Sequence, residues 1–373
     1  MRIGTVQTVP HIRVNGPATG RGHDIGVAAS ERIAKSLENY AETFDHYTGL
    51  AWGTICDRAE AFLPAIEAYD QEIADEMRGI ARGAGVDLRD ILALNVRTEV
   101  MYGISATINA ECTAFGAEQG LNADGHVVIG QNWDWRPVCR DACILLEVEQ
   151  PGKPSFVTFL EAGLVGKMGL NSSGVGLVTN LLVTDGDRGD VGVPFHVVLR
   201  GILNSTSVRQ GVGAVTRARR AASANYLIAS RDGDIRNLET GPGGGESVYT
   251  SFPGDGLLTH ANCFLTELDT IGDVGLEKLP DSPARTARLR ELLSSRGVLG
   301  VQEIKEGLVD HSGYPGSICR HVNEEDHPIE QIATNASLIM DLTTCEIHLA
   351  VGPPCEGSYD TVTPGFAREL QPN

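Results

Sequence analysis

The stretch Glu-Cys-Thr-Ala-Phe-Gly at residues 111–116 is the part of this chain from which the fold can be worked out. It predicts a short strand that opens on a cysteine. A second strand, Val-Val-Ile-Gly-Gln-Asn-Trp-Asp-Trp at 127–135, follows across Asn-Ala-Asp-Gly at 122–125, and Asp-Gly strongly favours a hairpin. This pairing would place Cys112 near Asn132 and Asp134. Two interpretations are open, a nucleophilic cysteine or a small buried thiol at the start of a strand.

Upstream of residue 111 the apolar residues recur at helical spacing. Residues 1–29 hold glycine and proline punctuation and a short strand at 2–8. Ser30 then caps a helix, the apolar stripes continue to Ile80, and Asp87 caps another helix that runs through Val96. Just beyond it, Arg97 and Glu99 are predicted to form a structural ion pair rather than to act in catalysis.

From residue 112 the period becomes strand-like. Strands are expected at 112–117, 126–134, 143–149, 155–161, 167–170, 175–182, 226–230, 235–239, 337–341 and 346–351. Helices are expected at 195–203 and 208–222, the latter with a solvated face that carries Arg217, Arg219 and Arg220. Helices, then runs of strands with helices between them, indicate an α+β protein with mostly antiparallel sheets packed face to face and covered by helices.

Composition and charge argue against several classes of protein. Of the 373 residues 42% are apolar, yet the sequence has no run of the ~18 apolar residues that a membrane-spanning helix needs. The first residues lack the apolar stretch of a signal peptide, so a cytoplasmic location is the expectation. The net charge of −19 argues against nucleic acid and anionic membranes as partners.

The chain has eight cysteines, for which we expect free thiols rather than a disulfide framework. Cys139 and Cys143 form a Cys-x3-Cys pair, but no second pair lies nearby and His126 is isolated. The usual spacing of zinc ligands is therefore missing, and the sequence predicts no metal site.

Five segments occur in an order that resembles a known family. They are Cys-Thr-Ala-Phe at 112–115, Gly-Gln-Asn-Trp-Asp-Trp at 130–135, Gly-Leu-Asn-Ser-Ser-Gly-Val-Gly-Leu-Val-Thr-Asn at 169–180, His-Ala-Asn at 260–262 and Tyr-Pro-Gly-Ser-Ile-Cys-Arg at 314–320. The pattern resembles the acyl-coenzyme A:6-aminopenicillanic acid acyltransferase family and is more distantly similar to bile-salt hydrolases and penicillin V acylases. The resemblance implies a four-layer αββα N-terminal-nucleophile sandwich with two antiparallel sheets.

The resemblance also implies self-cleavage between Glu111 and Cys112. The new α-amine of Cys112 would then activate its own thiol, because an amine with a pKa of ~7.7–8.0 and a thiol of ~8.5 exchange a proton readily. Residues 1–111 would become a helical α subunit and residues 112–373 a β subunit, held together as one globular heterodimer. Glu111 stands where the fungal member of that family has glycine.

Other roles follow from the same resemblance, residue by residue. Asp134 matches the aspartate that holds the nucleophile's amine, and Asn262 matches the oxyanion-hole asparagine. Arg320 matches an active-site arginine, and Asn180 matches an active-site asparagine of the bile-salt hydrolase branch. Gln131 replaces an arginine of that branch, which argues against bile-salt specificity. The aromatic residues expected to line a pocket are Phe115, Trp133 and Trp135.

We therefore predict a self-processing amidase or N-acyltransferase that works through a Cys112 acyl-thioester and needs no cofactor. Its substrate would be a small-molecule amide or acyl thioester, with a coenzyme A thioester as one option, and a higher oligomer is left open. One alternative keeps the chain uncut, with His260 as a conventional base for Cys112. The other is an inactive binding protein with the family fold.

Overall fold

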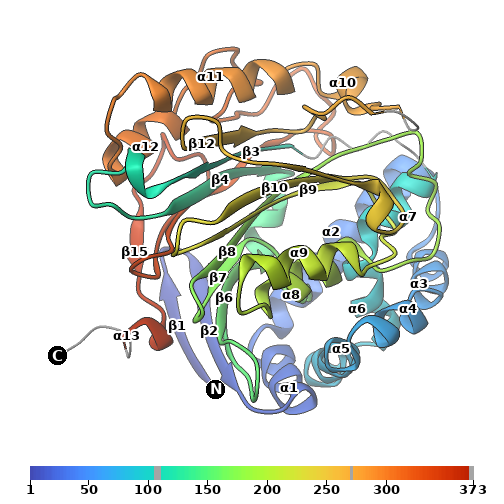
Figure 1. Ribbon diagram of the computed structural model, residues 1–373. Coiled ribbons are helices and arrows are strands. Elements are labelled where there is room, and N and C mark those ends of the chain that lie inside the picture. Colours follow the sequence, from blue (N-terminus) through green and yellow to red (C-terminus); the bar gives the residue numbers. More distant parts are fainter. Residues whose placement is uncertain (105–110, 269–271, 369–373) are drawn as a thin grey trace.

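The computed structural model describes residues 1–104, 111–268 and 272–368. Two β-sheets lie face to face with helices on both outer sides (Figure 1). The nine-stranded sheet has the order β1-β2-β5-β6-β7-β8-β9-β10-β11, and the six-stranded sheet has the order β12-β3-β4-β13-β14-β15. The predicted four-layer α+β sandwich is thus confirmed. One pair departs from the antiparallel prediction, since β2 and β5 run parallel.

The strands of the nine-stranded sheet are β1 (Arg2–Val6), β2 (Val9–Asn15), β5 (Cys143–Glu149), β6 (Phe156–Glu161), β7 (Gly169–Asn171), β8 (Val175–Leu181), β9 (Ala224–Ser230), β10 (Ile235–Thr240) and β11 (Val248–Ser251). Those of the six-stranded sheet are β12 (Leu257–His260), β3 (Glu111–Ala117), β4 (Val128–Trp135), β13 (Ala333–Asp341), β14 (Glu346–Val351) and β15 (Asp360–Val362). Strands β3 and β4 pack on β8 of the other sheet, so the main core lies between the layers.

The helices form the outer layers. The N-terminal ones are α1 (Ala18–Ala28), α2 (Ser30–Thr48), α3 (Trp52–Glu60), α4 (Leu63–Tyr69), α5 (Gln71–Ala84), α6 (Leu88–Asn95) and α7 (Arg97–Ile104), and they lie with α8 (Phe195–Leu203) and α9 (Val208–Thr216) outside the nine-stranded sheet. Over the six-stranded sheet lie α10 (Gly275–Lys278), α11 (Ser282–Ser294) and α12 (Val301–Leu308), and α13 (Gly365–Arg368) lies near the C-terminus. No helix among the described residues has the length and apolar character needed to cross a membrane.

Helix α1 falls in the stretch that the sequence predicts to be punctuation. Its glycines serve close packing, because α1 and α5 touch backbone to backbone. A Cβ on Gly22 would lie 2.3 Å from the carbonyl oxygen of Glu76, and one on Gly79 would lie 2.5 Å from that of Thr19. Glycine lowers helix propensity, but here it permits a contact that no larger residue allows.

Two predictions about charged residues are wrong. Arg97 pairs with Glu161 at 2.9 Å, while a carboxylate oxygen of Glu99 accepts the backbone N–H of Phe195 at 2.6 Å. Arg220 is buried rather than solvated, because α9 ends at Thr216 and the guanidinium of Arg220 turns inward to donate to backbone carbonyls such as that of Gly241 at 3.3 Å. Buried charges find partners from distant segments, which helical spacing along one segment does not reveal.

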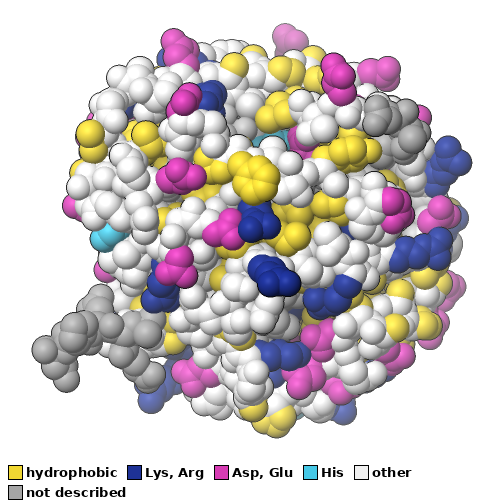
Figure 2. All heavy atoms as spheres, viewed as in Figure 1, with side chains coloured by type: hydrophobic (Ala, Val, Ile, Leu, Met, Phe, Trp, Pro, Cys, Tyr) yellow, Lys and Arg dark blue, Asp and Glu magenta, His cyan; other side chains and the backbone are white. Residues whose placement is uncertain are grey.

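On the face drawn in Figure 2, the excess of acidic side chains is not gathered into one patch. Figure 2 shows acidic and basic side chains interspersed there, with hydrophobic side chains gathered near the middle of the face, where β10 and β12 lie in Figure 1. The large exposed apolar side chains of the molecule include Phe252 and Leu265.

A buried ion-pair triad joins the N-terminal helices to the rest of the chain. Glu76 on α5 accepts from Arg200 on α8 at 2.5 and 2.9 Å, and it also pairs with Arg21 on α1. Burial alone would raise the pKa of Glu76, but the two guanidinium groups outweigh it and lower that pKa. The carboxylate of Glu76 lies between two buried positive charges and compensates both.

We predict that Glu76→Gln lowers the free energy of unfolding by about 3–5 kcal/mol, because it leaves buried guanidinium charge uncompensated. Urea denaturation at neutral pH measures this, with exposed Glu31→Gln on α2 as the control. Since the folded-state pKa of Glu76 is lowered, its stabilisation is present above the unfolded pKa and is lost as the pH falls through the folded one. Equal stability of the two variants would contradict the role assigned to the triad.

Candidate active site

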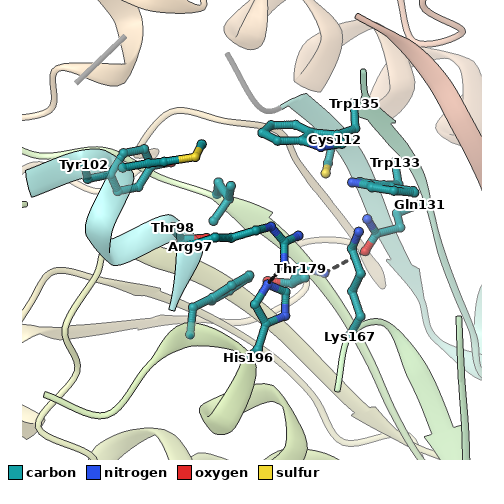
Figure 3. A pocket seen from close by; sticks show the side chains of 13 residues that line it. Arg97, Thr98, Tyr102, Cys112, Gln131, Trp133, Trp135, Lys167, Thr179 and His196 are labelled. Carbon is teal, nitrogen blue, oxygen red and sulfur yellow. Dashed lines mark hydrogen bonds between the residues drawn. The ribbon is translucent and has the colours of Figure 1, made fainter. Parts of the chain in front are cut away.

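Strand pairing places Cys112 at the mouth of a buried cavity. In the register of β3 with β4, Glu111 faces Asp134 and Cys112 faces Trp133, which confirms that Cys112 lies by the polar end of β4. Residues directly opposite each other in a sheet point to the same side, so Cys112 and Trp133 both reach the inner face and line the same cavity (Figure 3). Cys112 is only 6% exposed.

Three side chains form hydrogen bonds with the backbone N–H and carbonyl group of Cys112. Its N–H donates to Oδ1 of Asn262 at 2.8 Å. Its carbonyl oxygen accepts from Nη1 of Arg285 at 2.8 Å and from Nδ2 of Asn180 at 3.2 Å. Arg285 also donates to Oδ1 of Asn262 at 3.2 Å and to Oγ1 of Thr113 at 2.8 Å. The predicted residues Asn262 and Asn180 thus meet Cys112 directly.

Arg285 is the residue that sequence reasoning missed. It lies on α11 and is 2% exposed, on the helix face that also buries Leu289 and Leu293. Positions 285, 289 and 293 recur every four residues, so they share one face of a helix. A charged residue within an otherwise apolar helical stripe is the signal that identifies it.

The amide of Asn262 is oriented by its partners. Its oxygen accepts two donors, while its NH₂ donates to the carbonyl oxygen of Leu181 at 3.0 Å. The sequence predicts this NH₂ as the oxyanion donor. Since the group has two hydrogens, one of them is used by Leu181 and the other remains for a ligand. In this continuous chain the carbonyl of Asn262, rather than its NH₂, faces Cys112.

Asp134 lies across from the Glu111–Cys112 peptide bond in the strand register and is fully buried. Its Oδ1 accepts from Oγ1 of Thr334 at 2.6 Å, and its Oδ2 has no hydrogen-bond partner among the described residues. Burial raises the pKa of Asp134, with Arg320 and Arg285 opposing the shift. Arg320 itself forms an ion pair with Asp281, so it acts on Asp134 through its charge.

The thiol of Cys112 is held in its protonated form. Burial raises its pKa to about 12, and the negative charge of Asp134 adds to the shift against the smaller opposing effect of Lys167. The continuous chain therefore has a neutral thiol at physiological pH, and a base is needed before it becomes a nucleophile.

The cavity is small and has an apolar wall and a charged wall. About 40 Å³ is open to the centres of water molecules, room for roughly three of them at ~10–15 Å³ each. Figure 3 shows Cys112, Trp133 and Trp135 on one side and Arg97, His196 and Lys167 on the other. The remaining lining residues are Thr98, Met101, Tyr102, Gln131, Thr179, Leu181 and Phe195.

Of the three aromatic residues predicted for the pocket, Trp133 and Trp135 line the cavity and Phe115 does not. Phe115 packs on the outer face of the six-stranded sheet in a cluster with Leu289 and Leu293 of α11. Side chains alternate across a strand, so residues 112 and 115 must point to opposite faces. The prediction for Phe115 is therefore wrong.

The three side chains of the charged wall have partners, two of them in Glu161, which lies behind the cavity lining. Glu161 accepts from Arg97 at 2.9 Å and from Lys167 at 3.0 Å, and the Lys167 ammonium lies 3.1 Å from the centre of the Trp133 ring. His196 faces Nη1 of Arg97 at 2.8 Å and the carbonyl of Gly166 at 2.9 Å, and burial lowers its pKa well below the usual value. His196 is thus neutral, with both ring nitrogens engaged.

Two donors on the cavity wall lack a partner among the described residues. They are Nε2 of Gln131 and Nε1 of Trp135. The other end of the Gln131 amide is fixed, because its Oε1 accepts the backbone N–H of Thr179 at 2.8 Å. A buried donor without a partner costs about 1–3 kcal/mol, so these two groups are suited to an acceptor on a bound molecule.

His260 lies outside the cavity lining. One ring nitrogen faces Oε1 of Glu239 at 2.8 Å and the other faces the carbonyl oxygen of Ala261 at 2.7 Å. Both ring nitrogens of His260 are thus engaged by other residues. A proton acceptor for Cys112 is not available at this histidine.

Two comparisons with known proteins agree on the same family. The family model for acyl-coenzyme A:6-aminopenicillanic acid acyl-transferase matches residues 121–354. The acyl-coenzyme A:6-aminopenicillanic-acid-acyltransferase 40 kDa form of Emericella nidulans is 30% identical over 324 residues, which cover 84% of this chain and 85% of that protein.

The solved structures that match have a lower sequence identity to this chain. Two variants of conjugated bile acid hydrolase from Clostridium perfringens, each with a single substitution, are 11% and 13% identical with TM-scores of 0.40 and 0.46, and each match covers 67% of this chain and 92% of the other. Penicillin V acylase from Agrobacterium tumefaciens is 11% identical with a TM-score of 0.38, over 64% of this chain and 83% of the other.

Proposed function

Because the chain belongs to the acyl-coenzyme A:6-aminopenicillanic acid acyl-transferase family, we propose that it is a self-processing N-terminal-nucleophile enzyme that forms an acyl-thioester on Cys112. The activity is amide hydrolysis or N-acyl transfer. The observation that carries the proposal is the set of hydrogen bonds to the N–H and the carbonyl oxygen of Cys112, whose side chain lines a cavity.

Self-cleavage activates the enzyme. The Cys112 sulfur attacks the carbonyl carbon of Glu111, the thiol proton passes to the amide nitrogen, and the C–N bond breaks, so that this nitrogen becomes the α-amine of Cys112. Water then hydrolyses the thioester, which releases the Glu111 carboxylate and restores the thiol. Asn262 accepts from the nitrogen of Cys112 throughout and keeps it in place.

The new amine supplies the base for the reaction with the substrate. It takes the thiol proton, and the resulting ammonium keeps its hydrogen bond to Asn262, while the negative charge of Asp134, which acts on Cys112, favours the positive charge. The thiolate attacks the substrate carbonyl, the leaving amine or thiol takes the proton from the ammonium, and water or an amine then accepts the acyl group. No cofactor takes part in these steps.

The substrate carbonyl is placed against the remaining NH₂ hydrogen of Asn262 and the two cavity donors without a described partner, Gln131 and Trp135. An amide or an acyl thioester of coenzyme A fits this chemistry as acyl donor. The cavity of the continuous chain is too small for such a molecule, so the proposal requires it to widen when the chain is cut. The proposed location in the cytoplasm rests on the sequence alone.

We predict that denaturing mass spectrometry finds fragments 1–111 and 112–373 in the wild type and an intact chain in Cys112→Ala. Gel filtration without denaturant is expected to keep the fragments together, because the buried pairs Glu76–Arg200 and Arg97–Glu161 join them. A wild type that stays whole and is active would exclude the mechanism. Separation of the fragments under native conditions, with activity retained by 112–373 alone, would exclude the heterodimer.

Asn262→Ala and His260→Gln distinguish this mechanism from a conventional Cys/His amidase. Loss of the Asn262 amide is expected to lower kcat by about 10²–10³-fold in processed protein, with little change in KM. His260→Gln keeps a donor for Glu239 and is expected to leave kcat within about threefold of wild type. The opposite ranking, with His260→Gln inactive, would establish the conventional pair. Inactivity of the wild type towards amides and thioesters would favour the binding-protein alternative.

Gln131→Met tests the placement of the substrate. It removes the NH₂ from the cavity at similar volume, together with the acceptor of the Thr179 N–H, and we expect the loss of the hydrogen bond to the substrate to lower kcat/KM by about 10–100-fold. Self-cleavage is expected to proceed, since Gln131 does not contact Cys112 or Glu111 through any described hydrogen bond. Exposed Gln119→Met is the control. A kcat/KM equal to that of the control would remove Gln131 from the substrate site.

A further inference from the structure

Four potential metal ligands converge outside the cavity. His311, Cys319 and His321 lie in the segment between α12 and β13, and Cys355 lies between β14 and β15. One ligand atom from each of the four lies within 4.8 Å of all the others. Cys319 is buried, His321 is half-buried, and His311 and Cys355 are exposed, so the group lies at the surface and is open to ions from solvent.

Four of the six distances among the ligand atoms are close to those of a tetrahedral site. A zinc ion with bonds of about 2.3 Å to sulfur and about 2.0–2.1 Å to nitrogen sets its ligands about 3.8 Å apart for S···S, about 3.5 Å for S···N and about 3.3 Å for N···N. Here the two sulfurs are 3.5 Å apart, Nε2 of His321 lies 3.8 and 3.3 Å from them, and the two Nε2 atoms are 3.1 Å apart.

Neighbouring groups orient the ligands as they do at known zinc sites. Nδ1 of His321 faces the carboxylate of Glu356 at 3.4 Å, which directs Nε2 toward the centre of the group. The Tyr314 ring lies 5.4 Å from that of His321, and the backbone N–H of Cys319 donates to the carbonyl of Asp310 at 3.0 Å. These contacts hold the ring of His321 and the backbone of Cys319 in place.

We propose that His311, Cys319, His321 and Cys355 bind one Zn²⁺ ion. Two sulfur and two imidazole ligands are a preferred set for zinc, and the two thiolates balance its charge. Binding forms two Zn–S and two Zn–N bonds and releases the two thiol protons to solvent. The sequence predicts no metal because Cys355 is far from the other ligands along the chain. Four protein ligands leave no open position, so the site is structural and not catalytic.

The site fixes the loop that carries Arg320. This residue lies between two of the ligands, pairs with Asp281 and donates its N–H to Thr334, the partner of Asp134. The adjacent carbonyl of Ile318 accepts from Asn132 on β4 at 2.8 Å. Zinc would thus join this loop and the β14–β15 connection in one geometry beside the candidate active site, with Arg320 as a positioning residue.

The test is the metal content of the full chain, expressed without a histidine tag, incubated with Zn²⁺ and passed through gel filtration. We expect about one zinc ion per wild-type chain by mass spectrometry of the metal, and less than about 0.2 for Cys355→Ser and for His321→Ala. Cys56→Ser and His327→Ala lie outside the group and are expected to keep the metal. A wild type that retains no zinc, or a Cys355→Ser variant that retains as much as wild type, would overturn the proposal.

Cobalt provides a readout that does not depend on the variants' folding. Co²⁺ added to the metal-free wild type is expected to give the intense visible bands of tetrahedral thiolate coordination, and stoichiometric Zn²⁺ is expected to abolish them. Weak octahedral bands would contradict the ligand set. A disulfide between Cys319 and Cys355 in protein purified without reductant, detected as a cross-linked peptide pair, would also overturn it.

Discussion

The hydrogen bonds to the backbone of Cys112 are the constraint on which the site depends. They come from β8 of one sheet through Asn180, from the segment after β12 through Asn262 and from α11 through Arg285. These elements belong to both sheets and to an outer helix. The position of Cys112 is therefore a property of the whole sandwich, and it is set only when the layers have packed against one another.

Electrostatics gives the carboxylate of Asp134 two opposite effects. Next to a neutral thiol it opposes ionisation, which adds to the effect of burial and keeps the pKa of Cys112 high. Next to an α-ammonium it would favour the charged form, because opposite charges attract more strongly in a buried site. In the proposed mechanism the same residue thus keeps the thiol unreactive toward other electrophiles until its own amine exists.

Much of the fold could be predicted from the sequence because the period of the apolar residues changes at residue 112. Strand alternation and the Asp-Gly turn were sufficient to place Cys112 opposite β4. Helix α1 could not be predicted, since its glycines are explained by a contact with α5 that is distant in sequence. Phe115 was placed on the wrong face although alternation alone decides its side.

The site could be predicted only where a family motif marks it. Asn180, Asn262 and Asp134 lie in such motifs, and the structure brings them to Cys112 or to its preceding peptide bond. Arg285 lies in a helix with no motif, and the Cys/His group near Arg320 joins segments that only the folded chain brings together. The sequence alone does not reveal contacts between segments that are far apart along the chain.

The most direct test of the central claim is chemical. An aromatic nitrile that condenses with 1,2-aminothiols reacts with a cysteine only when that residue carries both a thiol and a free α-amine. After incubation of the purified wild type, we expect this reagent to label the peptide that begins at Cys112 and to abolish activity. An active enzyme in which Cys112 remains unlabelled under denaturing conditions would contradict the account.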